Sequence, residues 1–372
     1  MGLESASAGS MAASILYRLV SVYSPSGREL EASKTLAEIA VELGLNAWLD
    51  NTNSVYITPE WSDGSAGILL VGHIDTVKGY IEPRFNGELV WGRGAVDAKG
   101  PLAAMLTSLS YASTSIREVR CPIALAALTG EEEDSRGAWN LVNTGRVPPL
   151  IVVGEPTNDT KVAIGYRGSM KVLIECKGRG GHSSAPWLGD SALDLLYGVI
   201  SEIKKLETGR GPGGLSIAVT RICGGDSWNV LPSSAEAYID IRIPPGVNPS
   251  TLRGNVLGIA HRPGCNAKIV AAEDPIRVKP SSPVPRSLMR GLLVQGIKPS
   301  LAIKTGTSDM NILGKHTHSI SAYGPGDSRL AHTTQEHVSV KSLEIAVKTY
   351  SHAIKELCNN KMAANTVPLP ID

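Results

Sequence analysis

The chain has 372 residues, of which 42% are hydrophobic and 19% are charged, and its 36 Lys and Arg nearly balance its 35 Asp and Glu. This composition is typical of folded globular proteins and excludes a largely disordered chain, which would have fewer apolar residues and a larger net charge. The net charge of +1 leaves no basic footprint for nucleic acid, and no apolar run approaches the roughly 18–20 residues that span a membrane. We therefore expect no nucleic-acid partner and no membrane partner, and the length fits about two domains.

The five cysteines are far apart in the sequence, odd in number and without a C-x-x-C motif. Most of them lie among apolar residues, which favours buried free thiols in a reducing compartment over a disulfide framework. We therefore expect a cytoplasmic protein without disulfides. Residues 1–10 are small and polar, and we expect them to lack regular structure.

The first part of the chain alternates between helix and strand patterns. Apolar residues at helical spacing predict helices around residues 15–20 and 36–43, and Gly44 ends the second one. Continuous apolar runs of strand length follow at residues 68–71, 123–128 and 150–153. A helix is predicted to begin near Pro101, between the first two runs. Strands that are apolar on both faces are typical of a mostly parallel sheet with helices on both sides, the α/β class.

The pattern changes at about residue 165. Shorter or alternating apolar runs predict strands at residues 170–176, 216–223, 235–243 and 268–271. Helical patterns separate the first strand from the second and the third from the fourth. The order β-α-β-β-α-β is the split βαβ unit of ferredoxin-like α+β domains, a four-stranded antiparallel sheet with two helices on one face. We expect a discontinuous α/β domain of residues 1–164 and 276–372, interrupted by an α+β domain of residues 165–275.

Titratable residues gather where the predicted α/β strands end. The three apolar runs lead into Gly72-His73-Ile74-Asp75, Gly130-Glu131-Glu132-Glu133 and Gly154-Glu155. A fourth acid, Asp97, precedes the helix that is predicted near Pro101. In open α/β sheets, ligands bind at the carboxyl ends of the strands. We therefore expect these side chains to converge in one crevice.

A crevice with three or more carboxylates needs a cation, because like charges at short distance repel strongly. Imidazole and carboxylate together suit Zn²⁺ or a related divalent metal, and the number of ligands favours two ions that share a carboxylate. Asp75 fits a group that orients the imidazole of a ligand His73. Taken singly, His73 also fits a structural histidine, residues 131–134 a solvated turn and Glu155 a loop residue. Their position at one sheet edge favours the metal site.

Five motifs occur along the chain in the order of one known family. They are G-H-x-D-T-V, G-R-G-x-x-D-x-K-G, G-E-E, G-E-P-T and G-H-S-S-x-P. With these motifs the sequence resembles the M20 family of dinuclear-metal peptidases and deacylases. That family includes acetylornithine deacetylase, succinyl-diaminopimelate desuccinylase and carboxypeptidase G2-type enzymes. The resemblance covers nearly the whole chain and implies that the inserted domain is a lid and dimerisation domain of a homodimer.

The resemblance also implies a role for each residue of the metal site. The implied ligands are His73 and Glu155 for one ion, Glu132 and His332 for the other, and Asp97 as the bridge between them. Glu131 would be the general base, and Asp75 would orient His73. The ions would be Zn²⁺ as the first choice, with Co²⁺ as the alternative.

The acidic run at residues 131–133 leaves the register open. The family places a glycine five residues after its ligand glutamate, and Gly137 then selects Glu132 as the ligand and Glu131 as the base. The alternative register shifts both roles by one residue.

The last ligand also has competitors, because His316 and His318 superficially resemble a metal-binding pair. The family pattern of a histidine followed four residues later by glutamate fits His332 and Glu336 instead. We therefore predict that His316 and His318 are loop histidines.

The resemblance implies further site residues in and near the inserted domain. His182 would stabilise the oxyanion, reaching across the dimer into the partner's site, and Asn229 and Arg242 would hold a substrate carboxylate. The turn Gly306-Thr307-Ser308 would line the substrate pocket. An alternative for Arg242 is a structural ion pair with the nearby Asp240.

The implied reaction is metal-dependent amide hydrolysis. The motifs around Asp97 and Glu132 are most similar to those of enzymes that release lysine or ornithine from the C-terminal glutamate side chain of a small acidic amino-group carrier protein. We expect this function in lysine and arginine biosynthesis. The alternatives are a deacetylase of N-acetylornithine or N-acetyl-lysine and, from another class, a non-catalytic amino-acid-binding protein.

Overall fold

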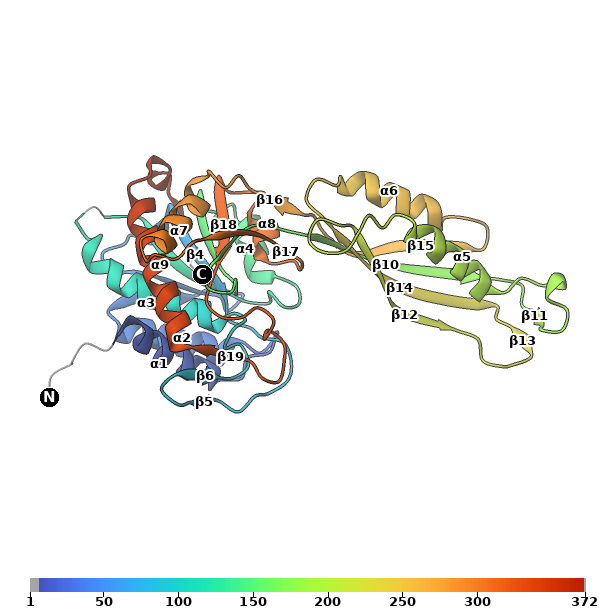
Figure 1. Cartoon of the computed structure of the whole chain (residues 1–372), viewed down its shortest axis with the longest axis horizontal. Helices are drawn as coiled ribbons and strands as arrows, with labels where there is room; N and C mark the ends of the chain where they lie inside the picture. The colour runs from blue at the N-terminus through green and yellow to red at the C-terminus, as the bar shows by residue number, and fades with distance from the viewer. Residues whose placement is uncertain (1–6, 119, 371–372) are drawn as a thin grey trace. The chain divides into compact units, whose positions relative to one another are not determined.

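The computed structural model describes residues 7–118 and 120–370, which form two compact units (Figure 1). Unit 1 comprises Met1–Ile164, Val278–Ala302 and Ser308–Asp372, and unit 2 comprises Gly165–Arg277 and Ile303–Thr307. The short second piece of unit 2 was not expected from the sequence. It joins unit 2 where the backbone N–H of Arg167 donates to the carbonyl of Lys304 at 3.1 Å.

The largest sheet is mixed, and its strands belong to unit 1 except for residues 165–166, 276–277 and 303–304, which belong to unit 2. Its strand order is β1-β2-β7-β4-β8-β18-β9-β16, and β17 also pairs with β9. The strands are β1 (Leu45–Leu49), β2 (Val55–Pro59), β4 (Ile68–His73), β7 (Ile123–Leu128), β8 (Leu150–Gly154), β9 (Lys161–Tyr166), β16 (Ile276–Arg277), β17 (Ser300–Lys304) and β18 (Ser319–Tyr323). The four strands β7, β4, β8 and β18 are parallel and buried along their whole length. The predicted mostly parallel α/β sheet is therefore confirmed.

Helices pack around this sheet. They are α1 (Ala8–Val20), α2 (Leu30–Glu42), α3 (Lys99–Ser115), α4 (Arg136–Asn143), α7 (Pro283–Leu293), α8 (Asp309–Leu313) and α9 (Val340–Cys358). Among them α1, α3 and α9 pack on one another and α7 packs on α9, while α4 packs on α8. The apolar faces predicted around residues 15–20 and 36–43 belong to the buried core. No helix among the described residues is both long enough and apolar enough to cross a membrane.

Shorter elements complete unit 1. They are the three-stranded sheet of β5 (Arg84–Phe85), β6 (Leu89–Trp91) and β19 (His337–Ser339), the pair β3 (Ser65–Ala66) and β20 (Val367–Pro368), and the 3-10 turn η2 (Lys361–Ala364). The helix predicted to begin near Pro101 is present. Helix α3 begins at Lys99, and Pro101 is tolerated in its first turn, where the missing N–H of proline has no partner to lose.

The expectation that residues 1–10 lack regular structure is wrong for their last part. Helix α1 begins at Ala8, and the Ser7 hydroxyl caps it by accepting from the Ser10 backbone N–H. Small residues can pack closely here, and Gly9 is buried next to Val340 of α9. Residues 1–6 lie outside the described part of the chain.

Unit 2 is a four-stranded antiparallel sheet with strand order β12-β14-β10-β15. Its elements are β10 (Gly168–Lys177), α5 (Ala192–Lys204), β12 (Ser216–Gly224), β14 (Ser234–Ile243), α6 (Pro249–Ala260) and β15 (Cys265–Glu273), with the small pair β11 (Gly181–His182) and β13 (Val230–Leu231) and the 3-10 turn η1 (Pro186–Leu188). Alternate residues of β14 are buried, as period-two patterning requires of a sheet with one covered face. The predicted split βαβ topology is confirmed.

The cysteine prediction is wrong for four of the five residues. Cys121 and Cys358 form a disulfide, and so do Cys176 and Cys265, whereas Cys223 is free. The partners are 237 and 89 residues apart in sequence, so spacing alone gives no sign of the pairing. Cys176 and Cys265 face each other on neighbouring strands with a Cα–Cα distance of 4.1 Å. Only strand pairing and helix packing bring the sulfurs together.

Candidate metal centre

The predicted metal ligands all lie in unit 1, and three of them follow the carboxyl ends of parallel strands. His73 is the last residue of β4, the acidic loop at residues 130–135 follows β7, and Glu155 follows β8. These strands are neighbours in the sheet, so their ends meet at one edge. Asp97 lies two residues before α3, and His332 lies in the loop between β18 and β19.

The ligand atoms form two groups of three that share Asp97. One group is His73, Asp97 and Glu155, and the other is Asp97, Glu132 and His332; within each group the candidate atoms lie within 4.8 Å of one another. Asp97 Oδ1 is 3.3 Å from His73 Nε2, and its other oxygen, Oδ2, is 3.4 Å from His332 Nε2. The two oxygens of one carboxylate thus face two different imidazoles, as a bridging ligand requires.

Hydrogen bonds between imidazoles and carboxylates shift the pKa values of this cluster. Burial opposes ionisation of Asp97, but hydrogen bonds with His332 and His73 outweigh it and hold the pKa of this carboxyl well below its usual range. Hydrogen bonds to Asp97 and Glu132 raise the pKa of His332 to about 10. A proton on His332 therefore supplies positive charge at a position where a bound metal ion would supply it. A set of two imidazoles and three carboxylates fits two divalent ions.

Glu131 and Glu132 point into the cluster, whereas Glu133 is exposed. Glu131 and Glu132 form a third candidate group with His73, and His332 Nε2 lies 2.8 Å from Glu132 Oε1. Burial raises the pKa of Glu131 well above its ordinary value, and the negative charge of Glu155 adds to this effect although His73 opposes it. A carboxyl group with a raised pKa holds a proton readily, which is a property of general bases in hydrolases.

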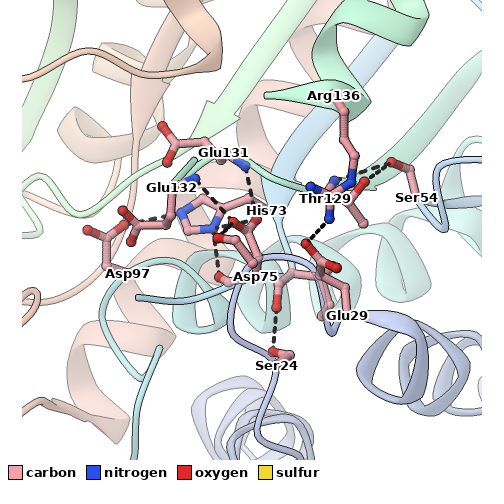
Figure 2. A network of polar contacts seen from close by, with 12 residues as sticks. Ser24, Glu29, Ser54, His73, Asp75, Asp97, Thr129, Glu131, Glu132 and Arg136 are labelled. Carbon is pink, nitrogen blue, oxygen red and sulfur yellow. Dashed lines mark hydrogen bonds and ion pairs between the residues drawn. The ribbon is translucent and has the colours of Figure 1, made fainter. Parts of the chain in front are cut away.

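Asp75 contacts both the histidine and the acidic loop. His73 Nδ1 donates to the main-chain carbonyl of Asp75 at 2.9 Å, and the nearest carboxylate oxygen of Asp75 is farther away, at 3.6 Å. The carboxylate instead accepts from the backbone N–H groups of Glu131 and Glu132, each at 3.1 Å (Figure 2). The imidazole is therefore oriented by the main chain of Asp75, while its side chain holds the loop that carries the two glutamates.

Glu336 is a contributor to the site whose role the sequence did not predict. Its buried carboxylate accepts from the backbone N–H groups of Val96 and Asp97 at 3.0 and 3.1 Å and from Arg93 Nη1 at 2.8 Å. These hydrogen bonds therefore hold the backbone at Val96 and Asp97 in place. The spacing of His332 and Glu336 is the signal that the sequence offers for this residue.

Asp309 was also missed. It begins helix α8 and is buried, and its Oδ1 has no hydrogen-bond partner among the described residues. Burial raises its pKa to about 7, and the charge of Asp75 contributes, although a hydrogen bond with Ser135 and the charge of His73 lower it. Its hydrogen bond with Ser135 and the packing of α8 on α4 show that Asp309 lies beside the acidic loop, which its position in the sequence does not indicate.

The other predicted site residues lie in unit 2 and are described within that unit. His182, on β11, is exposed, and its Nδ1 accepts from the backbone N–H of Ser184 at 3.1 Å. The exposed Asn229 bonds to Ser227, and Arg242 pairs with Asp240 at 2.9 Å. This ion pair is the structural alternative that the sequence left open for Arg242. Gly306 and Thr307 end the short second piece of unit 2.

His316 and His318 lie outside the metal cluster. Both are exposed in the loop between α8 and β18, and neither belongs to a candidate metal-ligating group among the described residues. His332 has a left-handed backbone conformation with φ of 64°, which is uncommon for a residue other than glycine. Its position in the cluster is therefore set by the loop around it and not by a regular element.

Comparison with known proteins identifies the class. A family model described as Peptidase family M20/M25/M40 matches residues 69–356. The chain belongs to this family of hydrolases, which confirms the resemblance seen in the motifs, and membership implies divalent metal ions.

Among its relatives, the protein named LysW-lysine/LysW-ornithine hydrolase of Saccharolobus solfataricus is 40% identical over 345 residues, covering 92% of this chain and 95% of the relative. The protein of the same name from Sulfurisphaera tokodaii is 38% identical over 352 residues, covering 93% of this chain and 96% of the relative.

Solved structures are similar over the same span. A tripeptidase from Staphylococcus aureus matches with a TM-score of 0.78 and 20% identity, covering 95% of this chain and 99% of that one. An M20 family metallo-carboxypeptidase from Sulfolobus solfataricus matches with a TM-score of 0.74 and 18% identity, covering 93% of this chain and 99% of that one. At such identities the likeness shows the fold alone.

Proposed function

We propose that the protein is a metal-dependent amide hydrolase that releases lysine, ornithine or both from the C-terminal glutamate side chain of a small acidic amino-group carrier protein. The observation that carries the chemistry is the pair of ligand groups that share Asp97. The substrate class is supported by the relatives at 38–40% identity, whose names specify LysW-linked lysine and ornithine. The proposal places the enzyme in the cytoplasm, in lysine and arginine biosynthesis.

In this proposal two divalent ions are held by residues of unit 1. His73 and Glu155 would hold one ion, Glu132 and His332 would hold the other, and Asp97 would contribute to both. Zn²⁺ is the first choice for this mixture of nitrogen and oxygen ligands, with Co²⁺ as the alternative. When bound, such ions lower the pKa of a water molecule and polarise the scissile carbonyl.

Glu131 moves the proton. Its carboxylate accepts a proton from the attacking water as the water oxygen bonds to the amide carbon. When the C–N bond breaks, Glu131 delivers this proton to the leaving amine of the amino acid, and the glutamate side chain of the carrier is left as a carboxylate. The burial that raises the pKa of Glu131 supports this role, because the group then accepts a proton more readily than an ordinary glutamate does.

We infer roles in substrate binding for residues of unit 2. His182 stabilises the oxyanion of the tetrahedral intermediate, and Asn229 and Arg242 hold the free carboxylate of the substrate. Arg167 supports the recognition of an anion, because its guanidinium donates to the carbonyl of Arg242 at 2.9 Å and adds a second positive charge nearby. The turn at Gly306 and Thr307 lines the pocket.

A homodimer belongs to the same proposal. Strand β12 is at the edge of the sheet in unit 2, and its side chains Val219 and Ile222 are exposed. A long edge strand with exposed apolar side chains is suited to pairing with a second copy. Sedimentation at micromolar concentration should give twice the 39.2 kDa chain mass, and Ile222→Lys should shift it toward the monomer. A monomeric wild type would reject the dimer.

The test of the function is a comparison of substrates. Metal-loaded protein should hydrolyse carrier-linked lysine or ornithine faster than N-acetylornithine or N-acetyl-lysine. Faster turnover of the free acetylated amino acids would favour the deacetylase, and no turnover of any amide would reject the hydrolase.

A pair of variants tests the role of Glu131. Glu131→Gln should lower kcat by about 10²- to 10⁴-fold because the proton acceptor is lost, while both metal ions remain bound. Glu133→Gln is the matched control, since Glu133 is exposed and lies two residues away. If Glu133→Gln instead loses metal, the register of the acidic loop is shifted by one and Glu132 is the base.

A further inference from the structure

The segment after α1 lies directly beside the residues that follow β4. The backbone N–H of Ser26 donates to the carbonyl of Thr76 at 3.2 Å, and the N–H of Thr76 donates to the carbonyl of Ser24 at 2.9 Å. Pro25 and Thr76 form a parallel β-bridge. The turn after α1 is therefore held next to Asp75 by these main-chain contacts.

Ser26 contributes a third donor to the buried Asp75 carboxylate. Its hydroxyl donates to Asp75 Oδ2 at 2.7 Å, and the same oxygen accepts from the Glu132 backbone N–H, while Oδ1 accepts from the Glu131 N–H. Asp75 has no exposed surface, so water does not compete for these oxygens. Charge-assisted hydrogen bonds of this kind are short and directional. Because the two N–H groups belong to adjacent residues, the carboxylate fixes the peptide between Glu131 and Glu132 and with it the direction of both side chains.

The same segment holds the far end of the acidic loop. The carboxylate of Glu29 is buried and accepts from the backbone N–H of Gly27 at 2.9 Å. It also forms an ion pair with the guanidinium of Arg136 (Figure 2). Arg136 in turn pairs with Asp134 at 3.0 Å. Residues 24–29 therefore support the acidic loop at two points. Ser26 acts through the Asp75 carboxylate, and Glu29 acts through Arg136.

We propose that Ser26 is a positioning residue for the hydrolytic reaction, acting through the Asp75 carboxylate on the Glu131–Glu132 peptide, and that Glu29 supports it through Arg136. This inference rests on the proposed function, because it takes Glu131 as the base and Glu132 as a metal ligand. It gives the Asp75 carboxylate the role of holding the acidic loop, in addition to the main-chain contact of Asp75 with His73.

Ser24 offers a matched control within the same turn. Its hydroxyl is fully buried and donates to the carbonyl of Ile74 at 2.8 Å. Ser24→Ala therefore removes one buried hydrogen bond of similar length and leaves the carboxylate of Asp75 untouched. Ser26→Ala removes the bond to the carboxylate, and Ser26→Thr keeps the hydroxyl.

The experiment measures kcat and KM of the metal-loaded full chain with lysine-linked carrier, together with thermal unfolding. Ser26→Ala should lower kcat by about tenfold with KM changed less than about twofold, because a displaced base slows the chemical step and not ground-state binding. Ser26→Thr should restore most of kcat. Ser24→Ala should keep the wild-type kcat while its unfolding temperature falls at least as far as that of Ser26→Ala.

A second measurement does not depend on turnover. Titration of metal-free protein with Zn²⁺ should show that Ser26→Ala weakens one of two binding events several-fold through the misplaced Glu132, whereas Ser24→Ala binds as the wild type does. If the wild type hydrolyses none of the amides, the proposed function fails and this titration still tests the positioning role. Equal kcat and equal Zn²⁺ binding in Ser26→Ala and Ser24→Ala would overturn the inference.

Discussion

At the scale of single residues, metal binding must displace a proton from a histidine of the metal-free cluster. A histidine ligand has to be neutral, but hydrogen bonds to Asp97 and Glu132 raise the pKa of His332 to about 10. Hydrogen bonds to Asp75 and Asp97 raise the pKa of His73 against the effect of its burial. His332 therefore carries an extra proton at neutral pH in the absence of metal, and the pKa of His73 is shifted in the same direction.

The first prediction follows from this charge state. Binding of Zn²⁺ at pH 7.5 should release a proton from His332, because an imidazole that binds metal is neutral. Calorimetry in buffers of different ionisation enthalpy should show this release as a buffer-dependent binding enthalpy. His332→Ala should release about one proton fewer. A binding enthalpy that is the same in every buffer would contradict the protonated resting state.

The second prediction concerns the buried carboxyl of Asp309. Its pKa is about 7 in the folded protein against an ordinary value of 3.8, so the folded state binds this proton more tightly than the unfolded state does. The folded state therefore loses stability relative to the unfolded state as pH rises from about 4 to about 7, by up to about 4 kcal/mol in total. Below this window the cost is absent, and above it the cost is constant.

Asp309→Asn removes this titration. In metal-free protein the variant should gain stability relative to the wild type as pH rises through the same window, and the difference should level off above about pH 8. Urea unfolding at a series of pH values measures the difference. A difference that does not change with pH would show that Asp309 does not titrate there.

At the scale of elements, the site depends on loops that are tied to each other by buried acids. Asp97 precedes α3 and His332 precedes β19, and the connection between these two loops is Glu336 with Arg93. Both side chains of this ion pair are less than a tenth exposed. A buried pair of this kind is costly to break at one partner, because the remaining charge has no compensation.

The third prediction tests this connection. Glu336→Ala should lower the free energy of unfolding by about 3–5 kcal/mol and reduce the metal content, because the N–H groups of Val96 and Asp97 lose their acceptor. The double variant Glu336→Gln with Arg93→Met should lose less, since it leaves no unpaired charge. Denaturant unfolding and metal analysis measure both effects. If Glu336→Ala keeps the wild-type stability and metal content, the connection does not support the site.

At the scale of the whole molecule, one disulfide lies in each unit. Cys121, before β7, is joined to Cys358 at the end of α9, and Cys176 is joined to Cys265 within unit 2. A cross-link that closes a long loop stabilises the folded chain, chiefly by restricting the unfolded one. Disulfides in an intracellular protein have precedent in hyperthermophilic archaea, so they are compatible with the proposed cytoplasmic location.

The fourth prediction follows from these pairings. Denatured, unreduced protein should show one reactive thiol, Cys223, and five after reduction. Cys358→Ser should lower the free energy of unfolding by about 2–5 kcal/mol. Reductant should lower the unfolding temperature of the wild type more than that of this variant. Five reactive thiols before reduction would show that the disulfides do not form.

The sequence alone determined the architecture and the composition of the cluster. Apolar runs without alternation identified the central strands, and the position of His73, Glu131 and Glu155 after those runs placed them at one edge, because parallel strands end on the same side. His332 could be chosen only through the resemblance, since it lies in a loop without a periodic pattern.

Tertiary structure alone decided which distant groups touch. Four contacts join segments that are far apart in sequence. They are the disulfide of Cys121 with Cys358, the hydrogen bonds of the Asp75 carboxylate with the acidic loop, the hydrogen bond of Ser26 with Asp75, and the hydrogen bonds of Glu336 with the backbone before α3. Periodicity reports which face of an element is buried, but it carries no information on which side chain of another element meets that face. Those contacts exist only once the helices and loops have packed on the sheet.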